Sequence, residues 1–305
     1  MKVKAMFMNY FKEGKIYQWD EKKEVYIITE NNFCENKDNS EFCLEKTEME
    51  KLLKFDFPHV QLDGCLKVKS GKMRANLKLV DEKLVTPNLE FTGEFTIAIE
   101  KLKIANKFVG DINERPVLQG INIANNCIMA TDGYFAYRTE CKNQSNIVVH
   151  SSYLKILSDL KGEITFKHND NIVCCEVDNT LYIGRLLSEK FPNLDGIYNQ
   201  ARYNNINFEK DELEKLLSFS SDKNDIIIFD KNKFKIISNY VNENYDFEAD
   251  IECNLEKPLC LPLKKLSTII SLINESNITI QYSDVVKPIT INNEFLILPL
   301  RFNKN

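Results

Sequence analysis

Side chains that could act as nucleophiles or metal ligands are few and scattered in this 305-residue chain. It has three histidines and nine cysteines, and the lack of any Cys-x-x-Cys pair argues against a zinc site. The adjacent Cys174 and Cys175, and Asp132 in a Thr-Asp-Gly turn, are the only candidates for catalysis, and none has a histidine at a suitable spacing. We therefore predict no catalytic residue, no metal and no cofactor. A hydrolase or another enzyme is the weaker interpretation.

Lysines offer a different chemistry, which is contact with phosphate. The formal net charge is −5, whereas a protein that binds DNA through its overall charge is usually basic. Any DNA-binding charge must therefore be confined to one surface. Flexible cations of this kind hold a duplex without reading its bases.

Such lysines lie opposite the apolar faces of predicted helices. Periodicity predicts helices at residues 46–54, 99–108, 152–160, 209–217 and 263–273. The lysines on these opposite faces are Lys46, Lys51, Lys54, Lys103, Lys107, Lys155, Lys264 and Lys265, and the family resemblance given below implies that they face DNA. The alternative is that these are ordinary solvated helix faces, and the acidic residues of helix 209–217 argue against a uniform basic lining.

The predicted helices belong to an internal repeat. Three segments, which begin near Phe42, Ile147 and Leu259, each read as a short strand, one amphipathic helix and three strands joined by tight turns. Their spacing of roughly 110 residues is the size of a domain. We expect an α+β fold with three domains, at residues 1–91, 92–201 and 202–305. The second and third are duplicated strand-helix-strand units, whereas the first lacks a convincing first helix and looks shortened.

Several stretches of the chain, in their order and spacing, resemble one known family. They are residues 66–72 (LKVKSGK), 114–121 (ERPVLQGI), 129–133 (MATDG), 184–193 (GRLLSEKFPN), 287–291 (KPITI) and 295–302 (FLILPLRF). Together they resemble the bacterial DNA polymerase III beta subunit, which is the beta sliding clamp. The resemblance covers residues 40–302, and the shortened first domain suggests a phage or mobile-element member.

The resemblance implies a DNA clamp fold with helices lining a central hole and antiparallel sheets outside. It also implies a function in DNA replication, as a non-catalytic processivity factor that encircles duplex DNA as a head-to-tail homodimer. The expected partners are double-stranded DNA of any sequence, a replicative DNA polymerase, a clamp loader and a second copy of the chain. We expect no membrane partner and a location in the cytoplasm, because neither a long apolar segment nor a signal peptide is present.

In this family, client proteins insert a short hydrophobic peptide between the second and third domains. By resemblance, the pocket here consists of Leu118, Thr131, Gly133, Tyr134, Phe135, Pro288, Leu298, Pro299, Leu300 and Arg301. An apolar slot with a polar rim suits an aliphatic or aromatic anchor. The alternative is that Leu298 and Leu300 are core residues of the last strand. Tyr134 and Phe135 stand where the family commonly has His-Arg, so the client motif is expected to differ.

The family's ring joint pairs late strands of the first domain with the first helix of the third. Here the resemblance suggests that Ala75 and Leu77 meet Leu217 and Phe219 of another copy. A second interpretation stays open, in which the chain binds or competes for clamp clients without encircling DNA. A stable closed oligomer would separate the two interpretations.

Overall fold

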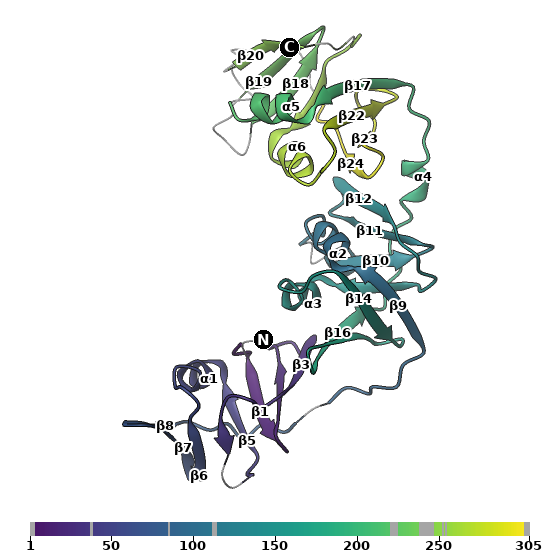
Figure 1. Cartoon of the computed structure of the whole chain (residues 1–305). Coiled ribbons are helices and arrows are strands. Elements are labelled where there is room, and N and C mark those ends of the chain that lie inside the picture. The colour runs from purple at the N-terminus through teal and green to yellow at the C-terminus, as the bar shows by residue number, and fades with distance from the viewer. Residues whose placement is uncertain are drawn as a thin grey trace. The chain divides into compact units, whose positions relative to one another are not determined.

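The computed structural model describes residues 4–36, 39–84, 86–111, 115–219, 225–237, 247–251, 253 and 255–301. Glu114 and Phe302, at the ends of two of the family-like stretches, lie outside these residues. Contacts group the chain into two compact units. Figure 1 labels the helices and strands along the chain. Unit 1 comprises Met1–Lys103, Asn122–Asn126 and Cys141–Glu189, and unit 2 comprises Ile104–Ile121, Cys127–Glu140 and Lys190–Asn305.

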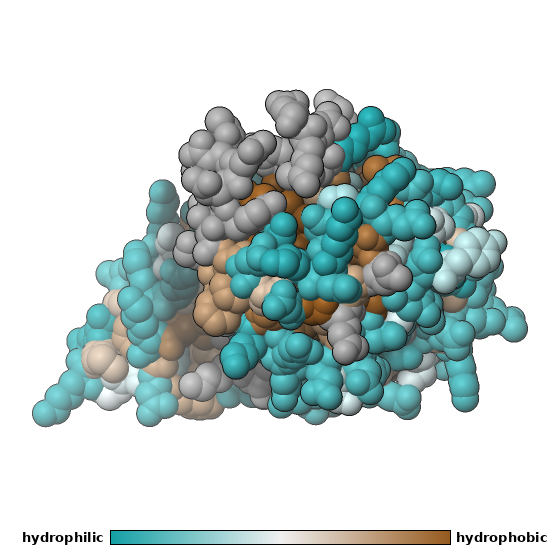
Figure 2. Space-filling model, turned by 90° about the horizontal axis from the view of Figure 1, so that it is seen from above, coloured by the Kyte–Doolittle hydropathy of each residue, from teal (hydrophilic) through white to brown (hydrophobic). Residues whose placement is uncertain are grey.

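The surface reflects a composition in which charged residues make up 28% of the chain. Hydrophilic residues cover most of the face seen in Figure 2, and hydrophobic ones show between them near the middle of the view. Among the described residues, no helix is both long and apolar enough to cross a membrane.

Unit 1 contains one long antiparallel sheet and one short sheet. Its N-terminal elements are β1 (Met8–Lys12), β2 (Lys15–Trp19), β3 (Val25–Glu30), β4 (Glu35–Asn36), β5 (Phe42–Glu45), α1 (Lys46–Leu52), β6 (His59–Asp63), β7 (Cys65–Ser70) and β8 (Met73–Leu77). Its later elements are β9 (Gly93–Ala98), β13 (Ile147–His150), α3 (Ser151–Ile156), β14 (Glu163–His168), β15 (Ile172–Val177) and β16 (Thr180–Leu187). The strands of the long sheet follow the order β9-β14-β15-β16-β3-β2-β1-β5, and β4-β6-β7-β8 form the short one.

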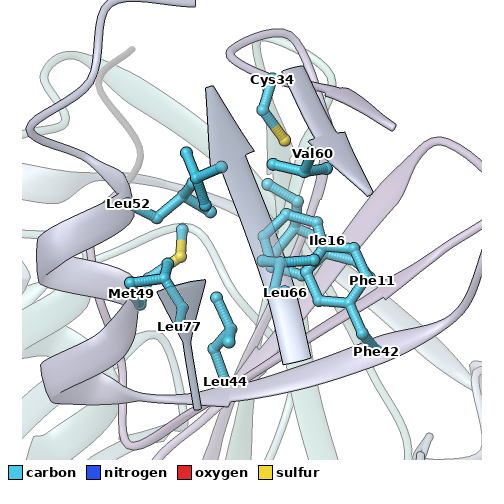
Figure 3. Packing of buried hydrophobic residues seen from close by; sticks show 11 residues of the cluster. Phe11, Ile16, Cys34, Phe42, Leu44, Met49, Leu52, Val60, Leu66 and Leu77 are labelled. Carbon is cyan, nitrogen blue, oxygen red and sulfur yellow. The ribbon is translucent and has the colours of Figure 1, made fainter. Parts of the chain in front are cut away.

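The helix α1 is held by the side chains of its apolar face. Figure 3 shows Met49 and Leu52 pointing from α1 toward Leu66 and Leu77, and all four side chains are buried. Fully burying one side chain of this size contributes about 1.5 to 3 kcal/mol. Leu77 belongs to the same buried cluster as Met49, Leu52 and Leu66, so its side chain packs inside the N-terminal part of the chain.

A pairing between distant parts of the chain completes the long sheet. β3 pairs with β16 over five positions, from Val25 opposite Gly184 to Thr29 opposite Thr180. The hydroxyls of Thr29 and Thr180 are 2.9 Å apart. Unit 1 therefore joins strands from the predicted first and second domains. The predicted domain boundaries stay a prediction.

The strands of unit 2 pair antiparallel, in two groups. Its elements are the 3-10 helix η1 (Pro116–Gln119), β11 (Cys127–Thr131), β12 (Phe135–Glu140), α4 (Asp195–Tyr198), β17 (Asn204–Glu209), α5 (Lys210–Leu217), β18 (Ile226–Asp230), β19 (Lys233–Ile237), β20 (Phe247–Asp250), β21 (Leu259–Pro262), α6 (Leu263–Ile270), β22 (Asn277–Tyr282), β23 (Ile289–Ile291) and β24 (Phe295–Ile297). Two elements, α2 (Ile99–Ala105) and β10 (Gly120–Ala124), contribute residues to both units. The strand orders are β17-β22-β23-β24-β12-β11 and β20-β19-β18-β21, and α5 and α6 lie side by side (Figure 1).

One type of tight turn recurs in the second and third predicted domains, and the internal repeat of three segments stays a prediction. Asn125–Asn126, Asp178–Asn179, Lys231–Asn232 and Asn292–Asn293 each have both residues at positive φ, between 43° and 64°. They connect β10 to β11, β15 to β16, β18 to β19 and β23 to β24. Two consecutive left-handed residues match the twist of a tight hairpin, and Asn and Asp tolerate this conformation. The same turn therefore stands at the same place in four strand pairs.

The predicted helices are present, and their apolar faces are buried as expected. Leu102 and Ala105 in α2, Leu154 in α3 and Leu266 in α6 are examples with side chains at most 3% exposed. Helices α1, α2, α3 and α6 end earlier than predicted because the apolar pattern continues into the turn that follows, as at Phe108, whereas α5 ends at Leu217 as predicted. The described part of residues 1–91 holds one helix, α1, and the shortening of this domain stays a prediction.

His150 is the N-cap of α3, and its capping hydrogen bond depends on pH. Its Nδ1 accepts a hydrogen bond from the Ser152 backbone N–H at 3.1 Å, which requires that nitrogen to be unprotonated. Burial lowers the pKa of His150, and Glu24, with a carboxylate oxygen 3.7 Å away, opposes that shift. The unfolded chain, with a histidine pKa of about 6.5, then binds more protons than the folded one as the pH falls.

We therefore expect folded unit 1 to lose stability as the pH falls from about 7.5 to 5.5, across the usual histidine pKa. The His150→Asn variant, which still offers a capping oxygen but does not titrate, should lose less. Urea unfolding followed by the fluorescence of the single tryptophan, Trp19, measures both. Equal pH dependence in the two proteins would contradict this role of His150.

Candidate functional site

The turn between β11 and β12 is built by its own side chains. The Thr131 hydroxyl donates to the Phe135 carbonyl at 2.9 Å and accepts from the Gly133 N–H at 3.0 Å. Asp132 Oδ1 accepts the backbone N–H groups of Tyr134 and Phe135, both at 2.8 Å. Gly133 has φ +90°, a conformation that side chains disfavour. The turn thus holds the Tyr134 ring outward, where it is 66% exposed.

Lys265 of α6 joins this turn. Its ammonium contacts Asp132 Oδ2 and lies 3.6 Å from the centroid of the Phe135 ring and 6.0 Å from that of Tyr134. The side chain of Lys265 is 28% exposed and that of Asp132 is 18% exposed. We predicted that Lys265 faces DNA; the structure places its ammonium against this turn, and its role in DNA contact stays a prediction.

The segment after β24 runs beside the same turn. The Leu298 N–H donates to the Tyr134 carbonyl at 2.9 Å, which continues the pairing of Phe135 with Ile297. Leu298 is partly exposed. Leu300 takes a different direction, because its N–H donates to the Cys260 carbonyl at 2.8 Å and it packs on the core around Cys260. Of the two leucines, Leu298 is therefore the one beside Tyr134.

An aromatic cluster supports the turn from inside. Phe108 lies 4.7 Å from Phe135, 5.6 Å from Tyr137 and 5.6 Å from Phe295, measured between ring centroids. These four rings are buried, at 8% exposure or less. Interacting rings at such distances pack favourably beyond their buried area. The site is thus an exposed ring, a partly exposed leucine and a lysine on a rigid base.

The other predicted pocket residues contribute unequally. Leu118 is 3% exposed and Thr131 is 5% exposed, so both act inside the structure. Pro288 and Pro299 are partly exposed, and Arg301 is exposed. We therefore keep Tyr134, Leu298 and their exposed neighbours as the candidate surface.

Comparison with known proteins gives a match in structure alone. No protein-family model and no curated protein matches the sequence. A putative DNA polymerase III beta subunit from Eubacterium rectale matches with a TM-score of 0.80 and 15% identity, over 99% of this chain and 93% of that one. The fold is that of a DNA polymerase III beta subunit. The Thermotoga maritima beta subunit matches equally well, with a TM-score of 0.80, 15% identity and coverages of 98% and 92%.

These matches confirm the resemblance to sliding clamps at the level of the fold, and with it the α+β clamp architecture. A third structure, the Helicobacter pylori beta clamp bound to a DNA ligase peptide, has a TM-score of 0.78 and 12% identity, with coverages of 97% and 92%. The predicted roles of individual residues are not tested by these likenesses and stay predictions.

The lysines expected to line the hole of the clamp fold differ in their surroundings. Lys46, Lys51, Lys54, Lys107, Lys155 and Lys264 are exposed. Lys51 pairs with Glu48 at 2.5 Å, and the ammonium of the partly buried Lys103 donates to the Leu160 carbonyl at 2.6 Å. Exposed lysines can reach phosphate at little cost, whereas Lys103 would first have to leave its carbonyl.

The residues expected at the clamp's ring joint divide into core and surface. Leu77 is 2% exposed and Leu217 is 8% exposed, so their side chains serve their own domains. Ala75 is partly buried. Phe219 is 55% exposed and stacks on Phe247 of β20 with ring centroids 4.3 Å apart. Phe219 is therefore the predicted joint residue that offers the most apolar surface.

Sequence reasoning missed a polar cluster around α4, which follows the family-like stretch 184–193. The Tyr198 hydroxyl donates to the Glu294 carbonyl at 3.0 Å, and the Arg138 backbone N–H donates to the same oxygen at 2.8 Å. The Arg202 guanidinium donates to carbonyls of α4 and of the residues after it, at 2.9 to 3.1 Å. The cluster ties α4 to the strands that carry the candidate surface. Isolated arginines and a tyrosine give no sequence signal of such partners.

The three residues considered for catalysis, Asp132, Cys174 and Cys175, contribute to the turn and to the core. Asp132 forms the turn, as predicted. Cys174 and Cys175 are buried, and burial raises their thiol pKa values to about 11 and about 12. Such thiols stay protonated and unreactive near neutral pH. Among the described residues, no group of three or more His, Cys, Asp or Glu side chains could hold a metal ion.

Proposed function

We propose that this chain is a non-catalytic DNA sliding clamp, which encircles duplex DNA as a head-to-tail homodimeric ring. A clamp loader would place it on DNA in the cytoplasm, and it would then make a replicative polymerase processive. The observation that supports this most is a whole-chain match to beta subunits at a TM-score of 0.80, which extends over 93% of the matched protein. Clamps need a closed topology and no chemistry.

The DNA side of the proposal rests on the exposed lysines of α1, α3, α6 and the turn after α2. Their contact with phosphate would be independent of sequence and would weaken with salt. The acidic net charge is compatible with this, because the acidic residues can occupy other surfaces. A clamp also needs to slide, and contacts with phosphates alone permit this.

The client side rests on the surface formed by Tyr134 and Leu298. The Helicobacter pylori clamp binds a DNA ligase peptide, and the Bartonella birtlesii clamp binds griselimycin. We infer that this chain captures polymerase and other clients through a short hydrophobic peptide at Tyr134 and Leu298. An exposed ring and a partly exposed leucine on a rigid aromatic base suit such an anchor.

For the ring joint we propose that the edge strand β8 of one copy contacts the stacked rings of Phe219 and Phe247 of the next copy. In the described residues β8 pairs with β7 and β20 pairs with β19, so each leaves one edge without a strand partner. The face of β8 is basic, with the exposed Arg74 directly opposite Lys69. Strand β20, which carries Phe247, also carries the exposed acidic residues Glu248 and Asp250. Opposite charges on the two edges favour a head-to-tail contact.

We expect Arg74→Glu to raise the dimer dissociation constant by at least about tenfold, because it reverses the charge at this edge. Lys190→Glu, an equal charge change at an exposed position away from the edge strands, should leave the dimer unchanged. Sedimentation equilibrium measures both, and the difference should shrink as salt screens the charges. Equal dissociation constants for the two variants would exclude β8 from the joint.

The function is tested by sedimentation and loading on nicked circular DNA with a cognate loader. A clamp is a dimer in solution, stays on the circle and leaves once the circle is cut. A protein that remains monomeric and never loads would overturn the proposal. If that monomer still bound client peptides, it would be a competitor for clients instead.

A further inference from the structure

Lys265 occupies an unusual position for a surface lysine. Its ammonium lies over an aromatic ring, at 3.6 Å from the Phe135 centroid, a contact that no other lysine assigned to DNA makes among the described residues. An ammonium has three N–H donors, and Asp132 Oδ2 accepts one of them. The cation is thus fixed in place with further donors beside the exposed Tyr134 ring.

Only one carboxylate oxygen of Asp132 contacts Lys265. Its other oxygen accepts two backbone N–H groups of the turn, so this carboxylate is shared between the turn and the lysine. The Lys265 side chain is 28% exposed, which leaves it within reach of a ligand but partly shielded from water. A partly desolvated cation attracts a carboxylate more strongly than a fully solvated one does.

The apolar part of the surface lies next to this cation. Tyr134 lies with its ring centroid 6.0 Å from the ammonium, and the Tyr134 carbonyl accepts the Leu298 N–H. A peptide side chain packed on Tyr134 and Leu298 would therefore place its neighbouring residue near Lys265. The cation, the exposed ring and the leucine belong to one compact unit, so their spacing is a property of unit 2.

We infer that Lys265 is a specificity-determining residue, which selects client peptides that carry a carboxylate next to the apolar anchor. This inference rests on the proposed function, because it names the chemistry of the peptide that the clamp would capture. Asp132 keeps Lys265 aligned while no peptide is bound.

The test uses two fluorescent eight-residue peptides that share an aliphatic-aromatic pair and differ only in Asp or Asn beside the aromatic residue. Wild-type protein should bind the Asp peptide about fivefold more tightly, the range for a partly exposed ion pair. Lys265→Gln, which keeps a donor for Asp132, should abolish this preference. Lys264→Gln, an exposed neighbour on the same helix, should retain it.

A second measurement needs no variant. The preference of the wild-type protein for the Asp peptide should shrink as the salt concentration rises from about 0.05 to 0.5 M, because salt screens a partly exposed pair. A preference that persists in Lys265→Gln, or that ignores salt, would overturn the inference and leave peptide capture intact. If neither peptide binds to any form of the protein, the failure lies with the proposed client site instead.

Discussion

Replacing Gly184 by alanine will lower the free energy of unfolding of unit 1 by about 3 kcal/mol, the upper part of the range for overpacking a core. An added Cβ would lie 2.6 Å from both Cβ and Cδ2 of Tyr153, closer than real contacts allow. Tyr153 is fully buried, and its hydroxyl donates to the Tyr182 carbonyl at 3.2 Å. Moving the ring to make room would break that bond, so the clash cannot be relieved cheaply.

The matched control is Gly196→Ala, because nothing lies within 4 Å of a Cβ at that position. Both variants can be followed by urea unfolding with far-ultraviolet circular dichroism, because Gly196 belongs to unit 2. The fluorescence of Trp19, which is 1% exposed and lies in β2, adds a probe of unit 1. Gly196→Ala should keep the unfolding midpoint of the natural protein. If Gly184→Ala kept it as well, Tyr153 would have to be free to move, contrary to its packing.

Introducing a charge at Leu298 should weaken peptide capture by about 100-fold, the scale of a central hot-spot residue. Leu298→Glu would place a carboxylate on the apolar surface beside Tyr134 and repel the carboxylate of a preferred client. The backbone of Leu298 is fixed by its bond to the Tyr134 carbonyl, so the new side chain cannot easily turn away. Fluorescence anisotropy with the Asp peptide measures the loss.

Val286→Glu is the matched control for Leu298→Glu. Val286 is 58% exposed and belongs to the same unit. Its replacement by glutamate also exchanges an apolar residue for an acidic one. Its variant should bind the peptide like the natural protein. An unchanged affinity in Leu298→Glu would move the client site away from Tyr134.

Much of the fold could be predicted because the repeat and the helix periodicity depend on local sequence. Residues such as Leu102, Leu154 and Leu266 recur at helical spacing, and each is buried. Hairpins with paired Asn or Asp residues are equally local signals. Helix ends were predicted less well, since apolar residues such as Phe108 continue to pack after the helix has stopped.

The candidate site was only partly predictable, because side-chain partners come from distant segments. Lys265 looked like any lysine opposite an apolar face, and its contact with Asp132 joins residues 133 positions apart. Leu77 looked like a surface residue of a late strand, whereas it closes the core under α1. Alternation along a strand distinguishes two faces but does not tell which of them a neighbouring element covers.

The pairing of β3 with β16 has a consequence for how the protein is made. The ribosome releases β3 long before β16, and at about 5 to 20 residues per second the delay is roughly 8 to 30 seconds. During that time one edge of β3 has no native neighbour, and open edges attract other strands. We expect the protein to need chaperones most while its N-terminal segment is being synthesised. The stability of the finished protein does not determine how strongly this segment aggregates before β16 is available.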